Sequence, residues 1–297
     1  MARLDTLGRL AFNVRPDDID LSIHPRPAEV EILSFLNIHG AVNTNFLREW
    51  CSYKHPKNTQ QALLRLWRGG YIFCPRQQRS ADNNNACVRV YELDDRGRHY
   101  LDRRDILATE RHRSNWWLHD YMVSCVSASI HIAARKAGYE FITRPYLLDR
   151  SGGQIWREVQ GKKLIPDDLF ALKSPDGFFR AFCVEADRSS EAGVTSKPNA
   201  KSYERAISQY AEFIGDNLYK EHFDLKARMF VLTVFNDKPS MRLYNRLIEE
   251  QLGECSYMLS QTVDNFQSDW QPPKETFDHL FTGEWQRVGH NPFNLNK

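Results

Sequence analysis

The sequence has few cysteines and no long apolar run. No stretch approaches the roughly 20 apolar residues that a membrane-spanning helix needs, and the first residues form no long apolar signal core. The 6 cysteines are spread singly, with no CxxC pair and no Cys/His cluster at the spacing of zinc ligands. These absences exclude a transmembrane helix and a zinc-finger site. We therefore expect a cytoplasmic protein with buried thiols and no membrane partner.

The net charge is also small, because 40 Lys and Arg residues oppose 38 Asp and Glu residues in a chain of 297. This charge is unevenly distributed. Residues 48–104 contain 12 basic and 6 acidic residues, a balance of +6, whereas residues 114–297 contain 22 and 24, a balance of −2. Such a local basic excess favours a polyanionic partner for the N-terminal part. The length and the 12% of aromatic residues are sufficient for about two domains.

The N-terminal part has the pattern of three helices followed by a β-hairpin. Residues 27–39 place apolar side chains on one helical stripe, with a proline at the first position and a glycine after the last. A short second helix follows around residues 44–50, and a third follows His55 and Pro56 over residues 57–70. Two strand-like segments, 71–75 and 87–93, are joined by a polar connector. This order predicts a winged helix-turn-helix.

We assign residues 1–112 to this winged-helix domain. Polar and basic side chains lie on the outward face of the third helix and in the connector, where they suit the phosphates and base edges of a DNA major groove. The expected DNA-binding residues are Lys57, Asn58, Gln61, Arg65, Arg68, Arg76 and Arg79. A winged helix used for protein contacts is the alternative, and the basic excess favours double-stranded DNA.

The rest of the chain alternates helices and strands, which predicts an α/β fold, α+β overall. A long helix over residues 114–138 precedes several strand-like segments, a helix that begins at Pro198 and a buried strand over residues 227–235. The strand-like segments are 139–145, 155–159, 166–173 and 178–187. This order defines a second domain over residues 113–255.

The C-terminal segment is predicted to be irregular. After an amphipathic helix that begins near residue 240, residues 256–297 are rich in glutamine, proline and aromatic residues. We expect this extension to lie over the second domain, or alternatively to fold against a partner. The expected anchoring side chains are Trp270, Phe277, Leu280, Phe281 and Trp285.

Three acidic residues fall near the ends of neighbouring strand-like segments. Asp167 lies early on one strand, Glu185 lies near the end of the next, and Asp187 follows on the same face of its strand as Glu185. Converging carboxylates repel one another unless a cation neutralises them, and Mg²⁺ or Mn²⁺ prefers oxygen ligands. Metal-assisted hydrolysis of a phosphodiester uses such a cluster. We therefore expect these three residues to bind the metal, and Asp168 to point to the opposite face.

The PD pair at residues 166–167 and the EAD triplet at residues 185–187 resemble the PD-(D/E)xK motif of the restriction-endonuclease-like superfamily. Enzymes of that superfamily usually place a lysine two residues after the second acid, where this sequence has Asp187. The resemblance therefore implies that the catalytic lysine is elsewhere. Lys197 and Lys201, four residues apart on the following helix, are the candidates.

A resemblance to a narrower family covers residues 25–235. The winged-helix pattern, the IPDDLFAL and CVEADRSS strands and the KSYERAISQY helix together resemble the replication-relaxation family of plasmid and mobile-element proteins. They also resemble the related C-class plasmid mobilization relaxases. In this resemblance Asp167, Glu185 and Asp187 match the acidic positions, and Lys201 matches the lysine of the following helix.

His119 and Glu158 also resemble positions of this family and are further candidate site residues. The better-known relaxases join DNA to a tyrosine and hold their metal with a His-hydrophobic-His pair, and the 10 histidines here include no such pair. Acid-bound Mg²⁺ or Mn²⁺ is therefore the expected chemistry. A covalent link to Tyr203 or Tyr210 is left open, with Tyr210 expected in the core.

Two functions follow from these patterns. The first is a site-specific, metal-dependent endonuclease, a nickase or relaxase that acts at the transfer or replication origin of a plasmid or mobile element. Its catalytic residues would be Asp167, Glu185, Asp187 and Lys201, and other relaxosome or replication proteins would be partners. The alternative is a non-catalytic origin-binding or regulatory protein with a degenerate nuclease fold, because position 187 lacks the usual lysine.

Overall fold

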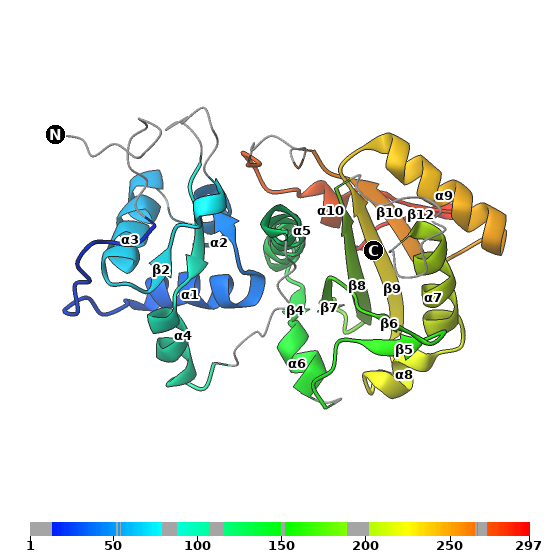
Figure 1. Cartoon of the computed structure of the whole chain (residues 1–297), viewed down its shortest axis with the longest axis horizontal. Helices are drawn as coiled ribbons and strands as arrows, with labels where there is room; N and C mark the ends of the chain where they lie inside the picture. The colour runs from blue at the N-terminus through cyan, green and yellow to red at the C-terminus, as the bar shows by residue number, and fades with distance from the viewer. Residues whose placement is uncertain are drawn as a thin grey trace. The chain divides into compact units, whose positions relative to one another are not determined.

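The chain forms two compact units (Figure 1). The computed structural model describes residues 14–51, 53, 55–78, 88–106, 116–149, 152–188, 202–264, 266 and 272–297. Unit 1 is Met1–Ala128 with Asn265–Thr276, and unit 2 is Ser129–Asp264 with Phe277–Lys297. The units divide within helix α5 (Trp117–Lys136), whereas we expected a boundary after residue 112, which lies outside the described residues. The mixed α/β composition confirms the predicted fold class.

Unit 1 combines short helices with a three-stranded antiparallel sheet in the order β1-β3-β2. Its elements before α5 are α1 (Pro27–His39), β1 (Val42–Asn43), α2 (Thr44–Cys51), α3 (Pro56–Arg68), β2 (Ile72–Phe73), the 3-10 helix η1 (Arg76–Gln78), β3 (Val90–Leu93) and α4 (Asp95–Asp102). The three predicted helices are present, and the third begins one residue and ends two residues earlier than predicted. The two predicted strands are shorter than expected, since β2 and β3 pair over only two residues.

Local chemistry sets the ends of α1. Pro27 occupies its first turn, where a missing N–H costs nothing, and the backbone N–H of Arg26 donates to Oε2 of Glu29 at 2.9 Å. Gly40 follows the helix with a φ of 77°, a conformation that side chains with a Cβ rarely adopt. The sequence signals at both ends therefore act as predicted.

Polar contacts tie the first part of α5 to unit 1. The Asn43 side-chain amide donates to the Tyr121 hydroxyl at 3.1 Å and to the carbonyl of Pro273 at 2.9 Å. Trp117 stacks on Tyr121, and its indole N–H donates to Glu92 at 2.9 Å. These buried or half-buried hydrogen bonds explain why the helix up to Ala128 belongs to this unit.

Unit 2 is built on a seven-stranded mixed sheet in the order β12-β11-β10-β9-β8-β7-β4. The pairs β8–β9 and β9–β10 are parallel, and the other neighbours are antiparallel. The strands are β4 (Glu140–Ile142), β7 (Asp168–Lys173), β8 (Phe179–Asp187), β9 (Arg228–Phe235), β10 (Met258–Thr262), β11 (Trp285–Arg287) and β12 (His290–Phe293). A separate antiparallel ribbon consists of β5 (Arg157–Val159) and β6 (Lys162–Leu164).

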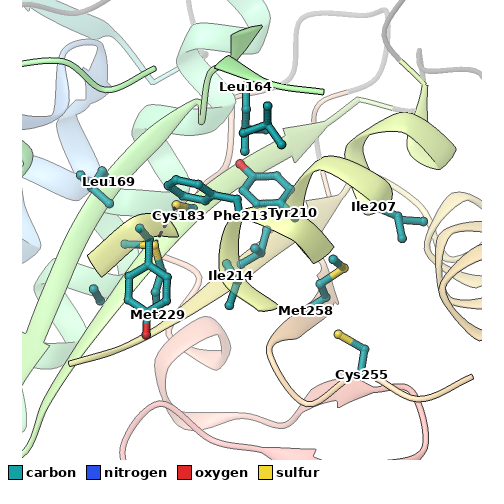
Figure 2. Close-up of a cluster of buried hydrophobic side chains, with 14 of the residues drawn as sticks. Leu164, Leu169, Cys183, Ile207, Tyr210, Phe213, Ile214, Met229, Cys255 and Met258 are labelled. Atoms are coloured by element: carbon teal, nitrogen blue, oxygen red, sulfur yellow. Dashed lines mark hydrogen bonds between the residues drawn. The ribbon is translucent and has the colours of Figure 1, made fainter. Parts of the chain in front are cut away.

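The helices of unit 2 after α5 are α6 (Arg144–Asp149), α7 (Tyr203–Gly215), α8 (Leu218–His222), α9 (Lys238–Leu252) and α10 (His279–Thr282). Helix α7 packs with β7, β8 and β9 around a buried apolar cluster in which Tyr210, Phe213 and Cys183 take part (Figure 2). The predicted start of this helix at Pro198 is wrong, because α7 begins at Tyr203, directly after Ser202, whose backbone is extended; residues 189–201 lie outside the described residues.

The prediction of an irregular C-terminal extension is wrong. Strands β10, β11 and β12 complete the sheet, and α10 lies between the first two of them along the chain. Two of these strands have only three or four residues, too few to show an alternating pattern in the sequence. The expected anchors Phe277, Leu280, Phe281 and Trp285 are buried, and Trp270 lies outside the described residues.

Cysteine burial follows the prediction. Among the described residues, Cys74, Cys125, Cys183 and Cys255 are buried and Cys51 is half-buried. Burial raises the pKa of the Cys74 thiol to about 11, so this thiol stays protonated at neutral pH. Within the described parts of the chain, no helix combines the length and the apolar character needed to cross a bilayer.

A row of aromatic rings covers the face of the sheet opposite the apolar cluster. Phe141, Phe170, Phe182 and Phe230 stack in sequence across β4, β7, β8 and β9, with ring centroids 4.7 to 5.8 Å apart. His131 of α5 continues the row, because its ring stacks on Phe141 at 4.1 Å. His131 is 9% exposed, and burial lowers the pKa of its imidazole to about 3, with a smaller effect from the charge of Arg135.

His131 is expected to make unit 2 sensitive to acid. Between about pH 6.5 and about pH 3 the unfolded chain binds a proton that the folded protein does not, so the free energy of unfolding falls as the pH falls. The slope from this residue is up to about 1.4 kcal/mol per pH unit. Urea unfolding of His131→Phe between pH 7.5 and 4.5 should therefore show a weaker pH dependence than the wild type. The exposed control His290→Gln should behave like the wild type, and an unchanged slope in His131→Phe would contradict the prediction.

Candidate functional site

The acidic residues of unit 2 meet where β7 begins and β8 ends. Asp167 precedes β7, and its backbone N–H donates to the carbonyl of Val184 at 3.0 Å. The backbone N–H of Ala186 donates to Oδ2 of Asp167 at 2.9 Å, which fixes this carboxylate beside β8. Asp187 is the last residue of β8, and its carbonyl accepts from the backbone N–H of Asn236 at 2.9 Å. The antiparallel pairing therefore places Asp167 next to Glu185 and Asp187.

Strand alternation places these acids on one face of the sheet. Leu169 on β7 and Cys183 on β8 both belong to the apolar cluster under α7, and Asp167 and Glu185 lie two residues away from them along the strands. Asp168 points to the opposite face, as predicted, where its Oδ1 lies 3.7 Å from Nη1 of Arg144. Adjacent aspartates thus have different surroundings.

Two tyrosines of α7 contact the acids. The Tyr210 hydroxyl donates to Oε1 of Glu185, and the Tyr203 hydroxyl, two turns earlier on the same helix, donates to Oδ2 of Asp187. All four side chains are at most 8% exposed. Burial raises the pKa of Tyr210 well above its usual value, and the negative charge of Glu185 raises it further. The phenol therefore keeps its proton and acts as a donor that orients the carboxylate.

The start of α7 is fixed by its own cap. The Ser202 hydroxyl accepts from the backbone N–H of Arg205 at 3.3 Å, which satisfies one of the unpaired donors of the first turn. Gln209 on the same helix donates to the carbonyls of Val159 and Lys162, at 3.0 and 3.4 Å, and so holds the β5–β6 ribbon. Tyr203 and Tyr210 thus project from a helix that is anchored at several points.

Asp167, Glu185 and Asp187 together form what we call the acid cluster. Its chemistry suits a hard cation, because all of its donors are carboxylate oxygens. In the present arrangement, however, the tyrosine hydroxyls already bind one oxygen of Glu185 and one of Asp187. Within the described residues no group of three or more His, Cys, Asp or Glu side chains is placed to hold a metal ion. The candidate lysines Lys197 and Lys201 lie outside the described residues. A metal would therefore require a local rearrangement of these side chains.

The other candidate site residues of the second domain differ from the acid cluster in burial and in position. Tyr203 is 3% exposed and its hydroxyl is hydrogen-bonded, so it is a buried partner of Asp187. Tyr210 packs in the core, as expected (Figure 2). Glu158 is exposed on β5, opposite Lys163 in the ribbon. His119 is half-buried on the part of α5 that belongs to unit 1.

Most of the expected DNA-binding side chains are exposed on unit 1. Helix α3 buries Thr59, Ala62, Leu63 and Leu66 on its inner side. The residues Lys57, Asn58, Gln61, Arg68 and Arg76 are exposed, and Arg79 lies outside the described residues. Two grooves, of about 440 and 500 Å³, flank the outer face of α3.

Arg65 has a structural contact that the sequence did not indicate. Its Nε lies 2.9 Å from Oε1 of Glu29, and its Nη2 donates to the carbonyl of His24 at 3.3 Å. Glu29 is only 2% exposed and also caps α1, so this ion pair links α3 to α1. The pair spans 36 positions of the chain and has no local signal. Arg65 is thus held against the protein rather than projecting like Arg68.

Sequence reasoning also missed residues that line the grooves beside α3. Gln60 and Leu64 lie on the outer face of the helix, and Arg89 and Arg26 come from neighbouring elements. The helical period alone could have identified Gln60 and Leu64, because they are three and seven residues from Lys57. The contribution of Arg89 and Arg26 depends on the tertiary fold.

Residues 33–224 match the model of the replication-relaxation family. The match covers more than half of the chain, so the protein belongs to the replication-relaxation family. Membership implies interaction with DNA and a role in the replication or relaxation of plasmids or mobile elements, which confirms this part of the prediction. No curated protein and no solved structure gives a significant match to the chain.

Proposed function

We propose that the protein is a site-specific, metal-dependent endonuclease that nicks DNA at the transfer or replication origin of a plasmid or mobile element. The observation that supports this proposal is the neighbouring position of Asp167, Glu185 and Asp187 on one face, at the paired ends of β7 and β8, in a chain of the replication-relaxation family. An acid cluster of this kind is the usual protein contribution to phosphodiester hydrolysis.

Unit 1 is proposed to be the winged-helix module that selects the DNA. Its order of three helices, two paired strands and a closing helix α4 supports this assignment. Helix α3 then acts as the recognition helix, and the segment between β2 and β3, which carries Arg76, acts as the wing. Other relaxosome or replication proteins are the further partners expected at an origin.

In unit 2 the acids and the tyrosines have different proposed roles. Asp167, Glu185 and Asp187 are the proposed ligands of Mg²⁺ or Mn²⁺, which when bound supplies charge stabilisation at the phosphate and a more acidic water. Tyr203 and Tyr210 orient the carboxylates through their hydroxyls. Lys201 is the proposed cationic residue, although it lies outside the described residues.

A plasmid assay tests this function. Supercoiled plasmid that carries the replication or transfer region from the protein's own source is incubated with the protein and Mg²⁺ or Mn²⁺, with EDTA as the control. We expect metal-dependent conversion to open circles, and a plasmid without that region should stay supercoiled. Intact supercoils in the presence of demonstrated DNA binding would reject the nuclease proposal.

A non-catalytic origin-binding protein is the second candidate. The specific observation in its favour is that the tyrosine hydroxyls donate hydrogen bonds to the buried carboxylates of Glu185 and Asp187. A nuclease needs such carboxylate oxygens as ligands of its metal. The residue at position 187 is also an acid instead of the usual lysine of the resembling motif. Under this function the protein binds the origin and leaves the plasmid uncut.

The DNA-binding surface leads to a prediction about salt. Arg68→Ala and Arg76→Ala each remove one exposed charge from unit 1, so each is expected to reduce the slope of log K against log [salt] by about 0.9 if the residue contacts a phosphate. Fluorescence anisotropy with a random-sequence duplex at several salt concentrations measures this slope. Arg242→Ala, an exposed change on α9 of unit 2, serves as the control. Equal slopes for the wild type and all three variants would contradict the assignment of this surface.

A further inference from the structure

Leu64 is an apolar residue in the middle of a polar helix face. Its side chain is 45% exposed, although the buried side of α3 is already formed by other residues. One turn before it lie Gln60 and Gln61, and one turn after it lies Arg68. The exposed face of α3 is thus a stripe of amide and cationic side chains with one aliphatic group at its centre.

The surroundings of Leu64 suit a polyanion. Leu64 lines both grooves that flank α3, one with Arg89 and the other with Arg26 and Arg68. The carboxylate among the lining residues is Glu29, which is buried and paired with Arg65. The accessible charges around Leu64 in these two linings are therefore positive. This charge pattern favours double-stranded DNA, which is a polyanion, over a protein partner with a basic surface.

The major groove of DNA presents one apolar group to such a helix. That group is the 5-methyl of thymine, while adenine in the same base pair presents a donor and an acceptor that match the side-chain amide of glutamine. An exposed leucine with glutamines three and four residues before it therefore has the chemistry to read an A·T pair. Guanine and cytosine offer no methyl group for the leucine to cover.

We propose that Leu64 contacts the 5-methyl group of a thymine, so that α3 distinguishes an A·T base pair at one position of the DNA site. This inference rests on the proposed function of unit 1 as a DNA-binding module. It adds a residue that determines base preference to the basic residues, which contribute affinity.

The test begins with a randomised duplex pool. The full-length protein, Leu64→Ala and the control Leu21→Ala are each used to select sequences, where Leu21 is an equally apolar side chain, 71% exposed, away from α3 along the chain. We expect the wild type and Leu21→Ala to enrich a site with a fixed thymine. Leu64→Ala should lose the preference at that base while it keeps the rest of the site. Circular dichroism verifies that the exposed substitution leaves the fold intact.

The second part of the test removes the methyl group from the DNA. When deoxyuridine replaces the selected thymine, wild-type affinity should fall about fourfold, as expected for one buried methyl group. Leu64→Ala should bind both duplexes equally well. A Leu64→Ala variant that keeps the thymine preference and the sensitivity to deoxyuridine would overturn the role of Leu64 alone. A wild type that binds no duplex of the pool would overturn both this inference and the proposed DNA-binding function.

Discussion

Asp167→Asn and Glu185→Gln are each expected to lower the rate of plasmid nicking at least about a thousandfold. Under the proposed function both carboxylates hold the metal, and a metal ion contributes several kcal/mol of transition-state stabilisation, of which roughly 4 kcal/mol corresponds to this factor. Both substitutions keep the size of the side chain. The amide oxygen introduced by Asp167→Asn can still accept from the backbone of Ala186, and the amide oxygen introduced by Glu185→Gln can still accept from Tyr210.

The control for these variants is Glu204→Gln. Glu204 is an exposed acid on α7, the helix that carries both tyrosines, so this change removes the same charge without entering the acid cluster. We expect it to nick at the wild-type rate. All variants are compared by urea unfolding and by affinity for the origin duplex. Wild-type nicking by a folded Asp167→Asn or Glu185→Gln variant would show that the acid cluster is not the catalytic centre.

The geometry of the acids could be predicted from the sequence because it depends on local rules. Alternation along a strand is enough to place Glu185 and Asp187 on one face and to turn Asp168 away from Asp167. The positions of α1 and α3 follow in the same way from helical periodicity and from the prolines and glycines at their ends.

Contacts between distant residues could not be predicted. Nothing in the sequence pairs Tyr210 with Glu185 or Tyr203 with Asp187, because a helix can meet a sheet in many registers. The same limit applies to the pair formed by Arg65 and Glu29, which changes the interpretation of Arg65 from an exposed DNA contact to a link between helices. Tertiary packing therefore decides which polar groups are available to a ligand.

The C-terminal strands show a different limit. Strands β11 and β12 are too short for a two-residue period to appear, and their place in the sheet depends on pairing with β10, whose residues 258–260 are buried. Composition rich in glutamine and proline suggested an irregular segment. The buried Trp285 at the start of β11 shows that such composition does not prevent a strand from being anchored in the core.

Arg144→Met is expected to lower the free energy of unfolding by about 3–5 kcal/mol. The Arg144 and Asp168 side chains are 6% and 9% exposed, and their charged atoms lie 3.7 Å apart. Removing the guanidinium leaves the Asp168 carboxylate buried without this countercharge, which is among the costliest changes that a single substitution makes. Urea denaturation with linear extrapolation measures the effect.

The double variant Arg144→Met/Asp168→Leu distinguishes this cause from a simple loss of packing. Replacing both partners also removes the buried carboxylate, so most of the lost stability should return, and the two single effects should not add. If the double variant is as unstable as the sum of the singles, the ion pair is not the origin of the effect. The double variant should also keep its nicking activity, because Asp168 faces away from Asp167, Glu185 and Asp187. Asp168 would then contribute to stability and Asp167 to catalysis, because adjacent residues of a strand face opposite sides of the sheet.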